Sequence, residues 1–120
     1  MPAPVIVAHD DKATRELAVA ALIAAGLTAV GFHDLMAALD AVEDDSRVRV
    51  LVARIDFGAG KLNGVALARM LKLKRPDVKT LFLALPENRE HAEGVGEFLP
   101  MPLVPYLLVD TVGRMLTTFD

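Results

Sequence analysis

Short runs rich in apolar residues alternate along the chain with longer segments whose apolar residues recur at helical spacing. The runs predict strands covered on both faces, because a strand with one face in water alternates apolar and polar residues instead. The five predicted strands are residues 5–8, 27–32, 48–53, 78–84 and 97–100. Pro100 places the last strand at a sheet edge, since proline cannot donate a hydrogen bond to a central ladder.

The segments between the strands predict five helices of unequal strength. Four have clear helical periodicity, over residues 12–26, 34–45, 65–75 and 105–119. Residues 85–96 are weak as a helix, because the segment is short and contains Pro86, Gly94 and Gly96.

The ends and the core-facing residues of the first two helices can also be predicted. Either Asp10 or Asp11 can cap the first helix, and Gly26 can end it. Asp34 can cap the second helix. The residues expected to face the core in these helices are Leu17, Ala18, Ala21, Leu22, Ala25, Leu35, Ala38, Leu39 and Val42.

Five strands alternating with five helices predict an α/β fold in which a parallel sheet lies between two layers of helices. Right-handed crossovers and short connections favour the three-layer, flavodoxin-like (βα)5 arrangement with strand order 2-1-3-4-5. In that order strands 1 and 3 are neighbours, and ligands bind outside the carboxyl ends of the strands. His9 and Asp10 leave strand 1 at this edge, and Arg54 and Asp56 leave strand 3. We therefore expect these four residues around one pocket.

Length and composition limit the classes of function. The 120 residues, 53% apolar and 24% charged, fit one globular domain over residues 1–120 with no output domain. A net charge of −3 without a basic stripe argues against a nucleic-acid partner. The absence of cysteine excludes disulfides and a thiol nucleophile. Without a signal peptide or a membrane-spanning stretch, the chain is expected to be cytoplasmic and to have no membrane partner.

Three short motifs, in their order and spacing, resemble one family over essentially the whole chain. They are HDDKATREL after the first strand, LNGVALARMLKLKRPD around the third helix and MPL after the fifth strand. Together they resemble the receiver domain of bacterial two-component response regulators, in the CheY-like superfamily. The resemblance implies a non-enzymatic role in phosphorelay signal transduction, with a histidine kinase or a downstream regulator as the protein partner.

The resemblance also implies a phosphorylation pocket. In the family, an acidic pair after strand 1 and an aspartate ending strand 3 hold Mg²⁺, and that aspartate accepts the phosphoryl group. A Thr or Ser ending strand 4 and a Lys ending strand 5 bind the phosphoryl oxygens. These groups act as phosphoryl-transfer sites do in general, since they neutralise charge on the transferred group and hold it in line.

This sequence departs from the family pattern where strand 1 ends. His9 falls at the first acidic position and Asp10 at the second, and Asp11 follows outside the usual pair. An imidazole is a poor Mg²⁺ ligand, because Mg²⁺ prefers hard oxygen ligands. We therefore expect Asp10 to be the one retained pocket carboxylate, although a helix cap has the same pattern.

Strand 3 allows two registers. Counting back from Gly64 with the common loop length makes Asp56 the phosphoacceptor, but this puts Arg54 inside a central strand, where an unpaired charge is very costly. Ending the strand at Ala53 instead makes Arg54 the exit residue and lengthens the glycine-rich loop by two residues. We prefer this second register, because four apolar residues then precede the first polar one, as in strand 1. Arg54 would then stand at the phosphoacceptor position.

Strands 4 and 5 contribute apolar residues to the predicted pocket. Ala84 stands where the family has Thr or Ser, and Met101 stands where it has Lys. Neither side chain can bind a phosphoryl oxygen. Phe98 falls at the family's switch aromatic position, although a plain core phenylalanine fits equally well.

These departures lead to one hypothesis and two alternatives. The hypothesis is a degenerate pseudo-receiver, in which Arg54 neutralises the remaining carboxylates as Mg²⁺ does in the family, so that no cofactor is expected. The first alternative is a conventional receiver phosphorylated on Asp56, with Mg²⁺ held by Asp10, Asp11 and Asp56. The second is a flavodoxin-like enzyme or nucleotide binder, which no phosphate-loop motif supports.

The last helix has more apolar residues than one buried stripe needs. Tyr106, Val109 and Val112 are therefore candidates for an exposed interaction face. Such a face can bind a signalling protein, or a second copy of the chain to form a homodimer. The weak fourth helix lies beside the surface through which receivers commonly signal, and so favours a changed partner.

Overall fold

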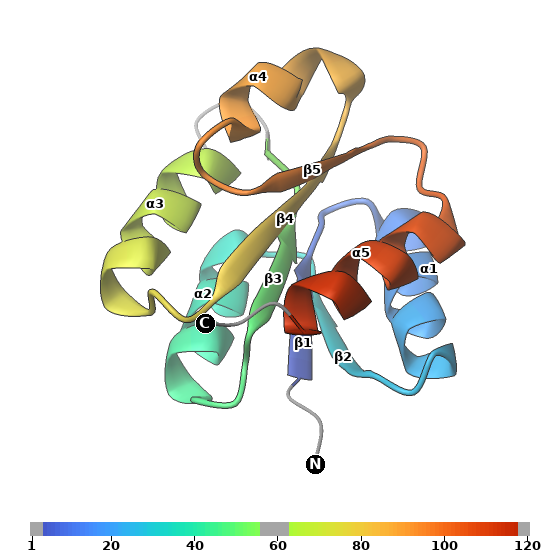
Figure 1. The fold of residues 1–120 in the computed structure, drawn as a ribbon, viewed down its shortest axis with the longest axis horizontal. Helices are drawn as coiled ribbons and strands as arrows, with labels where there is room; N and C mark the ends of the chain where they lie inside the picture. Colours follow the sequence, from blue (N-terminus) through green and yellow to red (C-terminus); the bar gives the residue numbers. More distant parts are fainter. Residues whose placement is uncertain (1–3, 56–62, 118–120) are drawn as a thin grey trace.

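The computed structural model describes residues 4–55 and 63–117, which form a parallel five-stranded sheet with helices on both faces. The strand order is β2-β1-β3-β4-β5, and every neighbouring pair is parallel (Figure 1). The strands are β1 Pro4–Ala8, β2 Thr28–Phe32, β3 Val50–Ala53, β4 Lys79–Ala84 and β5 Glu97–Pro100. The predicted fold class, the strand order and the edge position of the last strand are confirmed.

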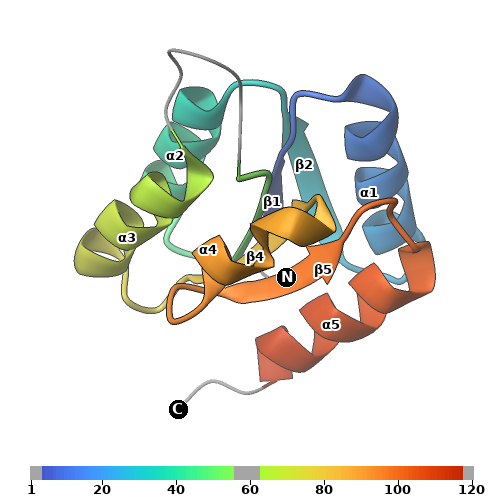
Figure 2. The same ribbon diagram turned by 90° about the horizontal axis from the view of Figure 1, so that it is seen from above.

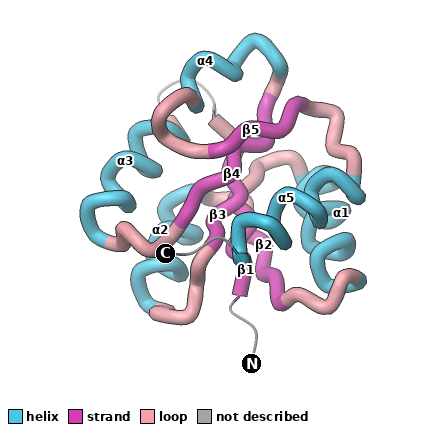
Figure 3. The backbone as a smooth tube through the Cα atoms, viewed as in Figure 1, coloured by secondary structure: helices cyan, strands magenta, loops and turns pink. Residues whose placement is uncertain are grey.

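Helices α1 and α5 cover one face of the sheet, and α2 and α3 cover the other (Figure 2). The helices are α1 Lys12–Ala24, α2 Leu35–Asp44, α3 Gly64–Lys74, α4 Arg89–Ala92 and α5 Pro105–Thr117. The segment predicted to be a weak helix is a 3-10 turn, η1 Pro86–Asn88, followed by the single turn of α4 (Figure 3). Gly94, with a φ of +75°, follows α4 in a conformation that favours glycine and ends helices.

Both faces of the central strands are buried, which explains their continuous apolar runs. On β1, Val5 and Val7 pack with residues of α1 and α5, whereas Ile6 and Ala8 pack with residues of α2 and α3. Because side chains alternate between the two faces of a strand, a polar residue inside β1 or β3 would lie in one core or the other. Polar residues therefore appear only where these strands end.

The buried face of α1 differs from the prediction, whereas all four predicted core residues of α2 are buried. The buried residues of α1 are Thr14, Ala18 and Leu22, which lie one above the other at a spacing of four. Leu17 is 46% exposed, because it lies about 100° around the helix from Ala18. Ala25 is also exposed, since it follows the last helical residue. The predictions for Leu17 and Ala25 were wrong.

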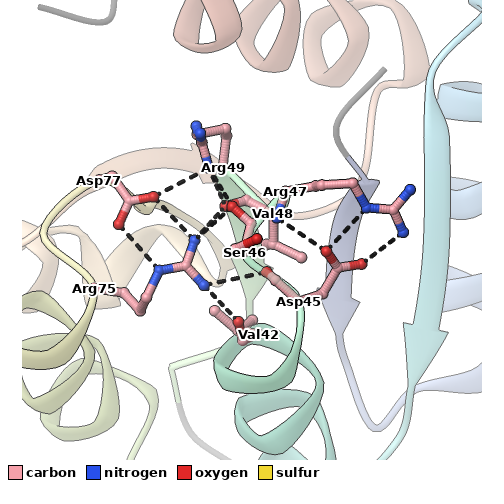
Figure 4. Close-up of polar contacts among 8 residues, drawn as sticks. All are labelled: Val42, Asp45, Ser46, Arg47, Val48, Arg49, Arg75 and Asp77. Atoms are coloured by element: carbon pink, nitrogen blue, oxygen red, sulfur yellow. Dashed lines mark hydrogen bonds and ion pairs between the residues drawn. The ribbon is translucent and has the colours of Figure 1, made fainter. Parts of the chain in front are cut away.

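Arg75 connects the amino end of β3 to the helices beside it (Figure 4). Its guanidinium donates hydrogen bonds of 2.7–3.2 Å to four backbone oxygens, those of Val42, Asp45, Ser46 and Val48. It also donates to both carboxylate oxygens of Asp77, at 3.0 and 2.9 Å. The last carbonyls of a helix have no partner within that helix, and Arg75 supplies one at the end of α2. This network lies at the end of β3 away from Ala53 and secures the scaffold there.

Candidate functional site

The carboxyl ends of β1 and β3 lie side by side. Ala8 and Ala53 are register partners, so the next residues, His9 and Arg54, leave the sheet at the same level. The Arg54 backbone N–H donates to the Ala8 oxygen at 3.1 Å, and the His9 N–H donates to the Phe32 oxygen at 3.0 Å. β3 ends at Ala53, as the preferred register predicts. Arg54 is therefore an exit residue and lies outside the central strand.

A pocket of about 280 Å³ opens beyond these strand ends. The residues that line it are His9, Asp11, Arg54, Ala84, Leu85 and Met101. Five of them are predicted pocket residues, and Leu85, directly after β4, adds an apolar wall. Asp56 lies outside the described residues, so its relation to this pocket remains a prediction.

The Arg54 side chain forms an ion pair with Asp10 between the two strand exits. Arg54 Nη1 lies 2.6 Å from Asp10 Oδ1, and the side chains are 34% and 38% exposed. Asp10 is thus one of the carboxylates that the hypothesis expects Arg54 to neutralise. At this exposure such a pair contributes about 0.2–1 kcal/mol, because water screens the charges and side-chain entropy opposes the contact.

Asp11 uses its carboxylate to cap α1. Its Oδ2 accepts hydrogen bonds from the Thr14 N–H at 3.0 Å and from the Thr14 hydroxyl at 2.5 Å. The hydroxyl first, and then the backbone N–H, stabilise the charged form and lower the pKa of Asp11 below its ordinary value. One oxygen of this carboxylate is thus held by the first turn of the helix, even though Asp11 borders the pocket.

His9 is buried, with 3% of its surface exposed, and burial favours the neutral form of its ring. Burial lowers the pKa of His9 most, and the Arg54 guanidinium lowers it further, whereas Asp10 and Asp11 raise it. Nδ1 accepts a hydrogen bond from the Asp11 N–H at 3.2 Å, which puts the ring proton on Nε2. Nε2 has no hydrogen-bond partner in the described part of the chain, although the nearby Leu83 backbone also raises the pKa.

Two contacts that were not predicted hold the strand exits. Arg15 Nη1, from α1, donates to the His9 backbone oxygen at 2.8 Å. The Gly64 N–H, from α3, donates to the Ile55 oxygen at 2.8 Å, and a Cβ on Gly64 would stand 2.1 Å from the Arg54 oxygen. Only glycine permits so close an approach of two backbones. The LNG motif singles out Gly64 in the sequence. No sequence pattern, in contrast, indicates that Arg15 contacts the His9 backbone.

The exits of β4 and β5 present no polar side chain to the pocket. Ala84 is 3% exposed, and its backbone oxygen accepts a hydrogen bond from the Met101 N–H at 2.8 Å. A methyl group and a thioether cannot replace the hydroxyl and the ammonium of a phosphoryl site. Phe98 is partly buried against Phe82 and its neighbours, and the Arg89 guanidinium lies 4.7 Å from its ring centroid.

The predicted interaction face of α5 needs one correction. Tyr106 is 68% exposed and Val109 is partly buried, but Val112 is fully buried in the core beneath α1 and α5. Val112 lies on the helix stripe that faces the sheet, so it cannot belong to an exposed face. The exposed apolar residues gather instead at the start of the helix, where Val104 and Leu107 line an apolar pocket of about 250 Å³.

The described part of the chain, residues 4–55 and 63–117, has neither a metal-binding cluster nor a membrane-spanning helix. No three histidine, cysteine or acidic side chains in these ranges are grouped so that they could hold a metal ion. No helix in the same ranges is both long and apolar enough to cross a bilayer. The two carboxylates beside the pocket are engaged separately, Asp10 by Arg54 and Asp11 by Thr14.

Solved structures that match this chain include response regulators. No family model matches the sequence, and no curated protein sequence does. The match to NtrX from Brucella abortus in complex with ADP has a TM-score of 0.86 and 25% identity, over 98% of this chain and 28% of NtrX. The receiver domain of that NtrX matches with a TM-score of 0.85 and 24% identity, over 96% of this chain and 99% of the domain. The chain has the receiver-domain fold.

Receiver proteins with lower sequence identity to this chain have the same fold. A response regulator receiver domain protein from Clostridium thermocellum has a TM-score of 0.84 and 18% identity, over 95% of this chain and 94% of that chain. The chemotaxis protein CheY4 from Vibrio cholerae has a TM-score of 0.81 and 19% identity, over 96% and 99% of the two chains. This chain spans little more than a quarter of the NtrX chain in the ADP complex. These matches at lower identity show the fold alone.

Proposed function

We propose that this chain is a receiver-like module of two-component or phosphorelay signalling that does not carry out phosphoryl transfer and acts through protein–protein contacts. The observation that carries the proposal is the ion pair between Arg54 and Asp10, whose charged atoms are 2.6 Å apart. The pair puts a permanent cation at the exit of β3, which we take to be the place of the family's phosphoacceptor. The altered pocket is therefore our reason for assigning the chain a binding role instead of phosphoryl transfer.

The residues described around the pocket fit Mg²⁺ poorly. Mg²⁺ requires several hard oxygen ligands in near-octahedral geometry. Asp10 is paired with Arg54, Asp11 caps α1 and His9 offers only an imidazole. A guanidinium supplies the positive charge that a metal supplies in conventional receivers, and it needs no binding equilibrium. We therefore expect no metal cofactor and no catalytic activity.

The pocket also lacks donors for phosphoryl oxygens. A phosphoryl group carries about −1.5 to −2 charges, which must be neutralised by cations and hydrogen-bond donors. Ala84, Leu85 and Met101 provide neither, and the Arg54 guanidinium is already engaged by Asp10. Without phosphorylation, the net charge of this pocket does not change between two signalling states. We therefore infer that the activity of the chain is regulated by the binding of a partner rather than by phosphorylation.

The partner we expect is a signalling protein, either a histidine kinase or a downstream regulator, and we assign it to the start of α5. Tyr106 is 68% exposed there, and Val104 and Leu107 line an apolar pocket. An exposed tyrosine beside an apolar pocket is typical of the residues that dominate binding energy at interfaces. Tyr106→Ala should therefore weaken capture of the cognate partner without unfolding the chain.

Intact mass after treatment with a small acyl phosphate and Mg²⁺ tests the proposed function. We expect no added phosphoryl group on the wild-type chain. The competing function is a conventional receiver phosphorylated on Asp56, with Mg²⁺ held by Asp10, Asp11 and Asp56. A phosphoryl adduct that disappears in Asp56→Asn, but persists when the exposed Asp44 is changed to Asn as a control, would establish the competing function instead.

A further inference from the structure

The two edges of the sheet are protected to different degrees. At one edge β5 is four residues long, ends in Pro100, and includes Glu97, whose carboxylate pairs with Arg114 of α5. At the other edge β2 has five residues with no charge and no proline, and its register with β1 is unbroken. Natural edge strands usually have such protective features, because an uncovered edge pairs with other chains. Over the described residues, β2 is the unprotected edge.

One hydrogen bond identifies the backbone groups that β2 turns outward. The His9 N–H donates to the Phe32 oxygen at 3.0 Å, so the backbone groups of Phe32 face β1. Backbone groups of successive residues in a strand face opposite neighbours, so those of Val30 face β1 as well. The N–H and C=O groups of Ala29 and Gly31 therefore face away from the sheet, one residue on either side of Val30.

Two large apolar side chains near this edge are exposed. Val30 is 45% exposed, and Ile23, on the part of α1 that borders β2, is 55% exposed. A groove of about 400 Å³ lies between α1 and β2, and the residues that line it are Arg15, Glu16, Val19, Ala20, Ile23 and Gly31. No charged residue occurs from Leu17 to Phe32, in a chain of which 24% is charged. Exposed apolar side chains on both sides of an open strand edge indicate a protein contact.

We propose that β2 is a dimerisation edge, at which two copies of this chain pair antiparallel about a two-fold axis at Val30. In this pairing Ala29 of each copy lies opposite Gly31 of the other, and their outward N–H and C=O groups form hydrogen-bonded pairs. The two Val30 side chains lie directly opposite each other at the axis, where cross-strand side chains are in contact. The two five-stranded sheets become one continuous sheet.

This uncharged surface suits a second copy of the chain better than a different protein recognised through complementary charges. A two-fold contact places groups near the axis beside their own counterparts, so any charge there would meet an identical charge. Residues 17–32 have none, and Arg15 and Glu16 at the rim of the groove are opposite in sign. The outward backbone groups are also symmetric about Val30. The proposal is independent of the proposed function, because the pocket and the β2 edge share no residue.

Sedimentation velocity of the full chain tests the proposed dimer. The wild type should sediment with about twice the monomer mass of 12.9 kDa and dissociate on dilution. Val30→Lys and Val30→Glu each place like charges at the axis, so each variant alone should be monomeric. Mixing the two variants places opposite charges there and should restore the dimer mass. Leu73→Lys makes the same change at an 87% exposed position on α3 and should remain dimeric.

Hydrogen exchange of the wild type gives a readout that needs no variant. The amides of Ala29 and Gly31 should become protected as the protein concentration rises, whereas rapid exchange at all concentrations would overturn the proposal. It would also be overturned by a wild type that stays monomeric, or by Val30 variants that stay dimeric. A dimer lost in Tyr106→Lys but kept in Val30→Lys would place the contact on α5 and refute the β2 edge.

Discussion

Arg54 lies at the boundary between a buried strand and an open pocket. Ala53, just before it, is 1% exposed, whereas the Arg54 side chain is 34% exposed. If β3 continued through Arg54, its guanidinium would lie in the core between the sheet and one layer of helices, where burying an unpaired charge is very costly. At the exit position it reaches Asp10 and keeps part of its hydration. The electrostatics of the pocket therefore follow from the residue at which β3 ends.

Removal of Arg54 should lower the free energy of unfolding at neutral pH. Arg54→Ala and Asp10→Asn should each lower it by about 0.2–1 kcal/mol, because each breaks the same ion pair. The double variant should lose less than the sum of the two losses. Urea unfolding at low and high salt measures this coupling. Arg47→Ala, which removes the cation from an exposed pair with Asp45, is the control and should be additive with Asp10→Asn. Zero coupling between Arg54 and Asp10 would contradict the assigned role.

His9 should make stability depend on pH. Its pKa is lowered in the folded chain, so the unfolded chain binds this proton first as the pH falls. Stability is therefore complete above the ordinary histidine pKa of 6.5 and is lost as the pH falls from there toward the lower folded pKa. His9→Asn should remove this loss, whereas His91→Asn, at an exposed position, should retain it. Urea unfolding over this pH range measures the effect, and equal pH slopes for wild type and His9→Asn would contradict it.

At the scale of elements, the approach of α3 to the exit of β3 positions Arg54. Gly64 is the first residue of α3, and its N–H bonds to the Ile55 oxygen at 2.8 Å. No side chain fits between the two backbones. This hydrogen bond holds Ile55 and Gly64, the two residues between which the loop runs, close together.

Alanine substitutions at two glycines should therefore have opposite effects. Gly64→Ala should lower the free energy of unfolding by about 1–3 kcal/mol, because its Cβ would stand 2.1 Å from the Arg54 oxygen and the backbone must move. Gly113→Ala, inside α5 with no atom within 4 Å of its Cβ position, should raise it by up to about 1 kcal/mol. Thermal unfolding of both variants measures the difference. Equal effects at the two positions would refute the close packing at Gly64.

Hydrophobic periodicity and the residues that begin or end helices and strands predicted most elements of this chain, because apolar spacing, capping residues and prolines are local signals. They were less informative about which stripe of an apolar helix faces the sheet. Leu17 and Val112 belong to helices with apolar residues on several sides, and only tertiary packing decides that Leu17 is exposed and Val112 is buried. The Arg75 network joins residues about thirty positions apart, so no local pattern could predict it.

At the scale of the whole molecule, the strand order brings pocket residues from distant parts of the sequence side by side. A parallel sheet gathers all its carboxyl ends on one side, so the exits of β1, β3, β4 and β5 could be predicted as neighbours. Opposite charges at adjacent exits favoured an ion pair of Arg54 with a pocket carboxylate, and the structure shows that this carboxylate is Asp10. The burial of His9 and its contact with Arg15 could not be predicted, because they depend on how α1 packs on the sheet.

The effect of Mg²⁺ on thermal unfolding tests most directly whether Arg54 supplies the charge that a metal supplies in conventional receivers. The wild type should unfold at the same temperature in MgCl₂ and in NaCl of equal ionic strength. Arg54→Ala frees the Asp10 carboxylate beside the unengaged oxygen of Asp11, so Mg²⁺ should raise the unfolding temperature of this variant more than NaCl does, because a bound ligand stabilises the folded state. Arg47→Ala should behave as the wild type. A wild type that Mg²⁺ stabilises as strongly as Arg54→Ala would contradict the claim.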